Sequence, residues 1–135
     1  MSASKFWSYF FEIYEAIPRQ GPGDRESTER ALRLLPPLTR GQRILDIGCG
    51  AGVDTIIAAL MAGQSGSATG LDLVPEMLAR AKVNARLAGA LNADFTEGST
   101  EELPFPDSSF DVVISNGVFN LVVDKVKALG EIYRV

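Results

Sequence analysis

The stretch Arg43–Asp54, with the sequence RILDIGCGAGVD, restricts the fold of this chain more than any other part. Apolar, β-forming residues lead into glycines at positions 48, 50 and 52, and a helical pattern of apolar residues begins directly afterwards. Glycines allow a sharp turn and a close approach to a ligand, and the start of a helix presents free N–H groups. We therefore predict a strand, a tight turn and a helix that hold a nucleotide-like ligand. Asp46 stands at the end of the strand, where a carboxylate can reach across the cleft.

Composition narrows the class of protein. The chain has 135 residues, enough for one domain with a core, and its 13 basic against 17 acidic residues give a net charge of −4. Because no cluster of Lys or Arg stands out, nucleic acid is not expected as a partner. Cys49 is the only cysteine and histidine is absent from the sequence, so we predict neither a disulfide nor a metal site. The general base used most often in enzymes is therefore also lacking.

The first 40 residues are predicted to form a helical segment that precedes a core domain at residues 41–135. Six of the eleven aromatic residues fall within residues 4–17, where apolar residues at helical spacing predict an amphipathic helix that ends before Pro18. This helix either packs on the core or forms a lid over the ligand, and both roles are compatible. A second helix is expected from Asp24, as its N-cap, to about Leu35. Glu12 and Glu15 interrupt the apolar run, so we expect no membrane span and a cytoplasmic protein.

From residue 43 onward the pattern alternates between strand and helix. The predicted strands are 43–47, 67–73, 93–96 and 110–115. The predicted helices are 53–62, 75 to about 88, and 124–135. Such alternation is typical of an α/β protein with a Rossmann-like, doubly wound parallel sheet, here of about four strands with helices on both faces.

Ligands of open parallel sheets bind beyond the carboxyl ends of the strands, so the residues just after each strand are the candidates for a site. Asp72, about twenty residues beyond the glycines, is placed to accept hydrogen bonds from two ribose hydroxyls. Leu73 and Met77 are placed to pack on an adenine ring. The third strand is followed by Gly98, Ser99 and Thr100, and the fourth by Asn116 and Gly117.

Purely structural interpretations of these residues remain open. Asp72 can serve as a helix N-cap, and Asp46 can satisfy local backbone amides. Cys49 is better explained as a small apolar filler than as a nucleophile. Asn116 can close a turn. Four such coincidences at four suitable places, however, explain the whole pattern poorly.

Several longer stretches resemble class I S-adenosylmethionine-dependent methyltransferases over about residues 18–135. They are the glycine turn with Asp46, the segment VPEML at 74–78 and the segment LPFPDSSFDVV at 103–113. Within that family the resemblance is strongest to the arsenite-methyltransferase-like branch. It rests on PRQGPGD at 18–24, on SNGVFNL at 115–121 and on the pair Asp124 and Lys125.

The resemblance implies S-adenosylmethionine as cofactor, a small-molecule methyl acceptor and transferase activity. The implied cofactor-binding residues are Asp46, Gly48, Cys49, Gly50, Asp72, Leu73, Met77, Ser99, Thr100 and Asn116. No catalytic side chain is predicted, because methyl transfer mainly requires orientation of the two reactants. Two departures stand out: Gly117 occupies the place of an arsenic-binding cysteine, and Ser99 the place of an acidic residue.

Two other functions are compatible with the sequence. The first is a non-catalytic module that binds the cofactor or assembles with another protein. The second is a nicotinamide-dependent oxidoreductase, against which the early position of Gly52 argues, because the dinucleotide fingerprint needs its third glycine one residue later.

Members of the family usually continue after a stretch like Glu131–Val135 with a Gly-rich turn and three more strands. The resemblance therefore implies that about the last third of the fold is absent from this chain. The fourth strand would then leave an apolar edge, which natural sheets avoid exposing. We expect that edge to be covered, for example by a second copy of the chain.

Overall fold

The computed structural model describes residues 39–135. The helices predicted within residues 1–38 lie outside this part of the chain. The division of the chain at residue 40 accordingly stays a prediction.

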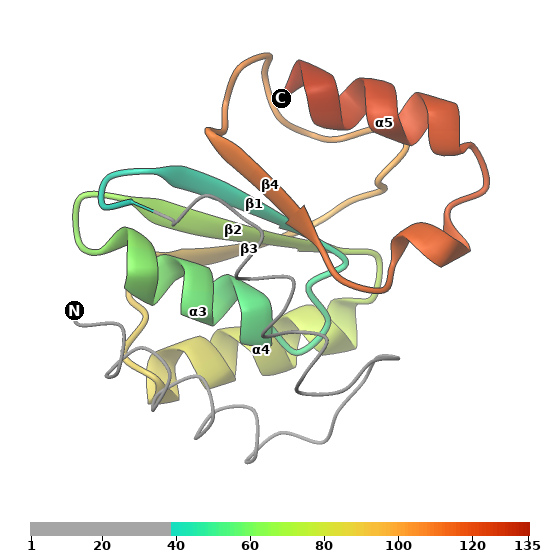
Figure 1. The fold of residues 1–135 in the computed structure, drawn as a ribbon. Coiled ribbons are helices and arrows are strands. Elements are labelled where there is room, and N and C mark those ends of the chain that lie inside the picture. The colour runs from blue at the N-terminus through green and yellow to red at the C-terminus, as the bar shows by residue number, and fades with distance from the viewer. Residues whose placement is uncertain (1–38) are drawn as a thin grey trace.

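Strands and helices alternate along the described residues as predicted (Figure 1). The elements are β1 (Arg43–Ile47), α3 (Val53–Ala62), β2 (Ser67–Asp72), α4 (Pro75–Leu87), β3 (Ala93–Glu97), β4 (Val112–Ser115), the 3₁₀ helix η1 (Phe119–Leu121) and α5 (Lys125–Arg134). Helix α4 carries Pro75 in its first turn, where a missing N–H costs nothing.

Some element boundaries differ from the prediction by one or two residues. Strand β4 begins at Val112 and not at residue 110, because the N–H of Phe110 donates to the carbonyl of Val135 and its ring packs edge-on against Phe105. Strand β2 ends at Asp72, whose carboxylate accepts the N–H of Val74 and so turns the chain. Helix α5 begins after Asp124, which accepts the N–H of Lys127 as an N-cap. The 3₁₀ helix η1 was not predicted.

The four strands form one parallel sheet in the order β3-β2-β1-β4. Strand β1 is central and pairs with β2 on one side and β4 on the other. The chain runs outward from β1 to β3 and then returns to place β4 on the opposite side of β1. The order of the strands therefore reverses between β1 and β4, which is the switch point where ligands of such sheets bind.

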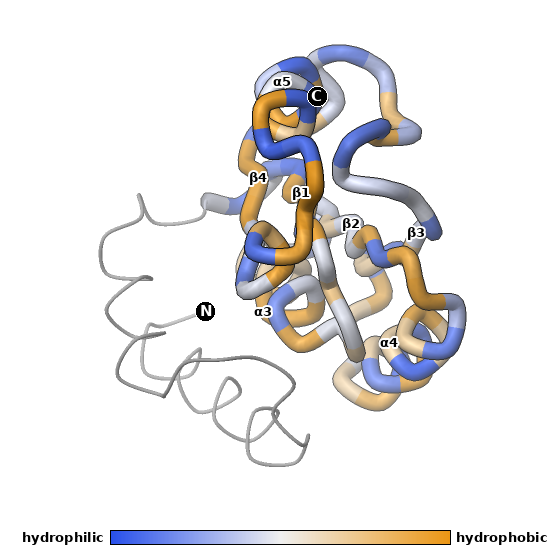
Figure 2. Tube along the Cα trace, turned by 90° about the vertical axis from the view of Figure 1, so that its right-hand side faces the viewer, coloured by the Kyte–Doolittle hydropathy of each residue, from blue (hydrophilic) through white to orange (hydrophobic). Residues whose placement is uncertain are grey.

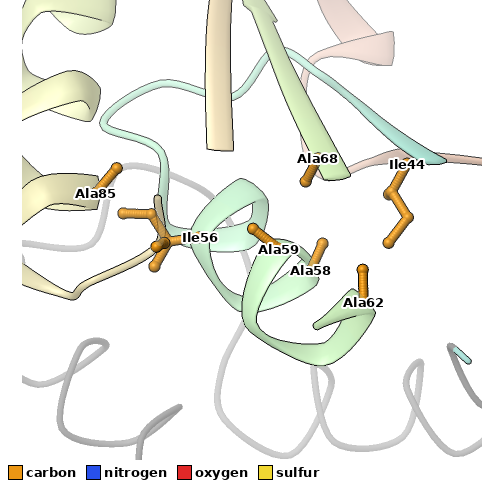
Figure 3. Packing of buried hydrophobic residues seen from close by; sticks show 8 residues of the cluster. Ile44, Ile56, Ala58, Ala59, Ala62, Ala68 and Ala85 are labelled. Carbon is orange, nitrogen blue, oxygen red and sulfur yellow. The ribbon is translucent and has the colours of Figure 1, made fainter. Parts of the chain in front are cut away.

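One face of the sheet packs against α3 and α4. Figure 3 shows Ile44 of β1 and Ala68 of β2 facing the small residues of α3, with Ala85 of α4 beside Ile56 at the other end of the cluster. Ile56 and Ala59 of α3 are fully buried in this cluster. Alanine side chains are small, so the helices can lie close to the sheet. This close approach fits the dense packing of protein interiors.

The other face packs against α5 and the loop that precedes β4. Its buried residues are Leu45, Ile47, Leu71, Leu103 and Val135. Figures 1 and 2 both place α5 on the opposite side of the sheet from α3 and α4, and Figure 2 shows the hydrophobic run of β1 lying between them. Helices thus cover both faces, which confirms the predicted Rossmann-like, doubly wound arrangement.

Candidate cofactor-binding site

The register of the sheet brings the predicted site residues to one edge. Ile47, the last residue of β1, lies opposite both Leu71 of β2 and Ser115 of β4, and Asp72 lies opposite Glu97 of β3. Gly48, Asp72, Gly98 and Asn116 therefore follow or end the four strands at the same edge. This edge includes the switch point between β1 and β4.

The glycine turn leaves β1 and enters α3 through backbone that favours glycine. The φ angles of Gly48, Gly50 and Gly52 are 75°, 51° and 87°. The N–H groups of Gly48 and Cys49 both donate to the carbonyl of Leu71, at 2.8 and 3.0 Å, which fixes the turn against β2. Helix α3 begins after Gly52, which has no side chain to cap it, and the backbone N–H of Thr55 is directed at Asp46, so the N–H groups of Val53 and Asp54 are the candidates to donate to a ligand.

Packing imposes a second requirement at Gly48. A Cβ atom at this position would overlap the side chain of Val118, in the segment between β4 and α5. Val118 thus lies directly over the turn and joins the two sides of the switch point. Gly48 is needed by the protein's own packing, whatever the turn binds.

Asp72 joins the glycine turn to the start of α4. Its Oδ2 accepts the N–H of Gly50 at 2.8 Å, and its Oδ1 accepts the N–H of Val74 at 3.0 Å. The N-cap of α4 is Val74, with no side-chain cap, so Asp72 is not the N-cap that one interpretation of the sequence suggested. Each carboxylate oxygen has two lone pairs, so both oxygens can still accept a hydroxyl.

Asp46 lies beneath the turn and is 2% exposed. The hydroxyl of Thr55 in α3 donates to its Oδ2 at 2.6 Å. Burial, and next the negative charge of Asp54, raise the pKa of Asp46 to about 7, although the bond from Thr55 acts in the opposite direction. The role of Asp46 toward a ligand stays a prediction.

Asp54 is a candidate residue that the sequence analysis did not identify. It stands in the first turn of α3, and its Oδ2 accepts a hydrogen bond from the side-chain amide of Asn116 at 3.1 Å. Burial raises the pKa of Asp54, and the bond from Asn116 partly offsets this. The two residues are 62 positions apart, so only the fold brings them together. An acidic residue in a first helical turn is common, and gave no signal of this contact.

Cys49 has a buried side chain, and burial raises the pKa of its thiol far above the ordinary value. Its sulfur belongs to the packing around Gly70, where a Cβ would come within 2.8 Å of it. Any contact of Cys49 with a cofactor would therefore involve the backbone.

The remaining predicted residues border the same edge. Leu73 is 65% exposed beside Asp72, and Met77 is half-buried in the first turn of α4. Ser99 accepts the N–H of Glu101 through its hydroxyl at 3.2 Å, which leaves its O–H able to donate. Thr100 is buried. The binding roles of these residues are not tested by the structure and remain predictions.

The edge carries three carboxylates, from Asp46, Asp54 and Asp72. Within residues 39–135 the ion pairs are Arg43 with Asp111, and Arg134 with Asp107 and Glu131, so none involves this edge. In the same part of the chain, no group of three or more His, Cys, Asp or Glu is arranged to hold a metal ion. Nor does any described helix have the length and apolar character to cross a membrane.

Comparison with known proteins identifies the family. A family described as a methyltransferase domain matches residues 38–135. The arsenite methyltransferase of Halobacterium salinarum is 41% identical over 103 residues, which cover 76% of this chain and 26% of that protein. The demethylmenaquinone methyltransferase of Listeria welshimeri is 37% identical over 112 residues, covering 82% of this chain and 45% of that protein.

A solved structure agrees with these relatives. The arsenic(III) S-adenosylmethionine methyltransferase of Chlamydomonas reinhardtii superposes with a TM-score of 0.77 at 35% identity, over 96% of this chain and 44% of that one. The chain spans less than half the length of each of these three proteins. The resemblance found in the sequence, including its arsenite-methyltransferase-like character, is thereby confirmed.

Proposed function

The chain belongs to the methyltransferase domain family, and on that basis we propose that it binds S-adenosylmethionine and takes part in methylation of a small molecule. The cofactor would lie at the carboxyl edge of the sheet, between the glycine turn and the start of α4. The relatives support this proposal, because each of the three is described as a methyltransferase.

The groups at this edge fit the parts of the cofactor. The carboxylate of Asp72 retains lone pairs for the two ribose hydroxyls. Leu73 and Met77 offer apolar surface beside it for the adenine, and the hydroxyl of Ser99 can donate to a ring nitrogen. The uncapped start of α3 suits the carboxylate of the methionine part.

The position of Asp72 is the observation on which the proposal mainly rests. Its two oxygens are held by N–H groups from two different segments, the glycine turn and the start of α4. A carboxylate fixed in this way lies between the turn and the exposed Leu73, where a ribose would join the rest of the cofactor to its adenine.

Methyl transfer requires little acid–base chemistry from the protein. When bound, S-adenosylmethionine would supply a methyl group on a sulfonium, and the sulfur would keep the electron pair of the broken bond as the acceptor's nucleophilic atom takes the methyl group. The chain's residues would hold the cofactor, align it with the acceptor and exclude water. We therefore propose binding residues and no catalytic side chain, as the sequence suggested.

The acceptor is proposed to be a small molecule. The names of two relatives mention arsenite or arsenic(III). Cys49 is the only thiol in this sequence and is buried, and Gly117 stands where the resemblance would place a cysteine. These features argue that the chain by itself does not bind arsenic through several thiolates.

Calorimetric titration with S-adenosylmethionine tests the proposal. We expect saturable binding by the wild-type chain and at least about tenfold weaker binding by Asp72→Ala, because a hydrogen-bonded carboxylate in a site of this kind contributes more than 1.4 kcal/mol. Asp94→Ala is the matched control, because Asp94 is an exposed aspartate at the amino end of β3, away from the site. Equal binding by the wild type and Asp72→Ala would contradict the proposed site.

Activity is tested separately with radiolabelled cofactor and candidate acceptors. Transfer of label to a small molecule supports transferase activity. Binding of the cofactor without any transfer would favour the non-catalytic module.

We also propose that the open edge of β4 pairs with a second copy of the chain. Within residues 39–135 β4 pairs with β1 alone, so the backbone groups along its outer edge lack a strand partner there. Open edges of this kind promote association. A cytoplasmic location and the absence of nucleic-acid partners also remain proposals, because Glu12 and Glu15 interrupt the N-terminal apolar run and the sequence lacks a basic cluster.

A further inference from the structure

The glycine turn after β1 is held by a side chain of α4. The side-chain amide of Asn84, in the second half of α4, donates from Nδ2 to the carbonyl oxygen of Ala51 at 2.9 Å. Ala51 lies between Gly50 and Gly52 and is 7% exposed, and 33 positions separate it from Asn84. The hydrogen bond therefore joins the turn to a helix that only the fold brings beside it.

Packing brings the same two segments into close contact. A Cβ atom at Gly52 would lie 2.8 Å from the Cβ of Ala81 in α4, which means that the backbone of the turn lies directly against this helix. Ala81 is buried and Asn84 is half-buried, and their spacing of three residues places them on one face of α4. Helix α4 thus gives the glycine turn both a packing surface and a hydrogen-bond donor.

A turn rich in glycine does not determine its own conformation. Glycine adopts left-handed backbone about as readily as right-handed backbone, so the peptide groups beside it can rotate at low cost. The φ angles of Gly50 and Gly52, which flank Ala51, are 51° and 87°. Contacts from other segments are therefore needed to select the conformation that the structure shows.

Asn84 fixes the peptide group between Ala51 and Gly52. The carbonyl of this group accepts the bond from Asn84, and its N–H donates to a carbonyl earlier in the turn at 2.8 Å. Rotation of the peptide group would break both hydrogen bonds and separate the carbonyl of a buried residue from its donor, which is costly. The first half of the turn is held separately, because the N–H of Gly50 donates to Asp72 at 2.8 Å.

We propose that Asn84 is a positioning residue for the cofactor site, because it holds Ala51 and so keeps the glycine turn in the conformation that binds S-adenosylmethionine. The inference rests on the proposed function and extends it to a residue that the sequence did not mark as part of the site. A protein that populates its binding-competent conformation only in part has a proportionally higher apparent dissociation constant. Loss of the bond from Asn84 should therefore weaken cofactor binding in chains that are still folded.

Calorimetric titration with S-adenosylmethionine tests the inference on three variants. Asn84→Leu keeps the approximate size of the side chain but removes the donor, and Asn84→Ala removes both. Each should weaken binding by about three- to tenfold, the range expected for one hydrogen bond. Asn84→Gln retains an amide donor and should bind more tightly than the other two variants.

Asn92→Ala is the matched control for a purely structural role. The side-chain amide of Asn92 also donates to backbone carbonyls, those of Ala59, Gly63 and Gly66, near the amino ends of β2 and β3. This variant should lower the melting temperature at least as much as Asn84→Ala does, yet bind the cofactor like the wild type. All titrations are made at a temperature at which circular dichroism shows the variants folded.

Wild-type affinity in Asn84→Leu and Asn84→Ala overturns the inference, and so does an equal loss of affinity in Asn92→Ala. If Asn84→Gln binds as weakly as Asn84→Leu, donation to Ala51 is not what positions the turn, and the inference fails. Where a variant does not fold, the comparison of Asn84→Gln with a folded variant that lacks the donor decides. Failure of the wild type to bind the cofactor would instead contradict the proposed function, so the two failures are distinguishable.

Discussion

Gly48 is a residue at which backbone conformation and packing exclude every other side chain. Its φ of 75° lies in the left-handed region, and a Cβ there would overlap Val118. We expect Gly48→Ala to lower the free energy of unfolding by about 2–4 kcal/mol, the sum of a backbone penalty and a steric one. Urea unfolding of wild type and variant measures this difference.

Gly89 provides the matched control for that experiment. Its φ of 70° is similar, but nothing lies within 4 Å of the place that a Cβ would take. Gly89→Ala should therefore cost only the backbone penalty of about 1–2 kcal/mol. Equal losses in the two variants would show that the contact with Val118 is not tight. Adding Val118→Ala to Gly48→Ala should recover part of the steric loss.

Single residues also show where sequence reasoning succeeded and where it could not. The place of Asp72 at the end of β2 followed from its distance to the glycines, because the spacing of a strand–turn–helix unit is local. Its bonds to Gly50 and Val74 were not predictable, since a carboxylate after a strand has several partners within reach. The pair of Asp54 and Asn116 depends on the return of β4 beside β1, which no local pattern encodes.

At the scale of elements, α5 is joined to the loop before β4 mainly by one side chain. Arg134 donates from Nε and Nη2 to Glu131, from Nη1 to the carbonyl of Phe105 and to Asp107, and from Nη2 to the carbonyl of Leu103. Glu131 in turn accepts the N–H of Leu103 at 2.8 Å. All five N–H groups of the guanidinium are thus used, which a lysine could not reproduce.

Replacing this side chain should loosen α5 from the loop. We expect Arg134→Met to lower the melting temperature by roughly 5 °C, because two loop carbonyls and Glu131 lose their partner. Calorimetry or circular dichroism measures the change. Arg80→Met, at an exposed position of α4, is the control and should melt close to wild type.

The stabilisation that Arg134 provides should depend on pH. The hydrogen bonds from Arg134, and next the one from the N–H of Leu103, lower the pKa of Glu131 from 4.5 to about 2. Because this pKa is lower in the folded chain than in the unfolded one, the stabilisation is complete above about pH 4.5 and is lost as the pH falls toward 2. The gap between wild type and Arg134→Met should therefore narrow over that range. A gap that stays constant would assign the loss to packing alone.

Elements were predicted most accurately where periodicity was strong. Helix α3 and strand β1 have the predicted bounds, because apolar spacing and flanking glycines mark both ends. The start of β4 was wrong because Phe110 and Asp111 continue the apolar alternation, while Phe110 bonds to Val135 and Asp111 to Arg43. Those contacts lie far apart in the sequence. The short η1 helix has too few residues to show a period.

At the scale of the whole molecule, α5 has more apolar surface than the sheet covers. Ile132 and Val135 pack in the cluster on the sheet and Ala128 is buried, whereas Val126, Leu129 and Tyr133 are 82%, 56% and 94% exposed. Their spacing of three and four residues places the exposed three along one side of the helix. Glu131 and Arg134 hold the loop on a different side, so this apolar side faces away from the loop.

The open edge of β4 and the apolar side of α5 together predict self-association. We expect light scattering to show a mass that rises toward twice the monomer mass at high micromolar concentration, because exposed apolar surface and a strand edge that has no strand partner within residues 39–135 both favour contact. Val126→Lys should shift this association to higher concentration. Val83→Lys, at an exposed valine of α4 on the opposite face of the sheet, is the control. A monomer mass at every concentration would contradict pairing between copies.

The two hydrogen bonds to Asp72 affect how much side-chain entropy is lost when a ligand binds. A side chain that must be immobilised when a ligand arrives loses rotamer freedom at that moment, which weakens the complex by about 0.5–1.5 kcal/mol. The N–H groups of Gly50 and Val74 already restrict the carboxylate through both of its oxygens. The entropy of that rotor is thus lost once, during folding. The carboxylate is a pre-organised receptor, and a ribose that reaches it meets an acceptor that is already correctly oriented.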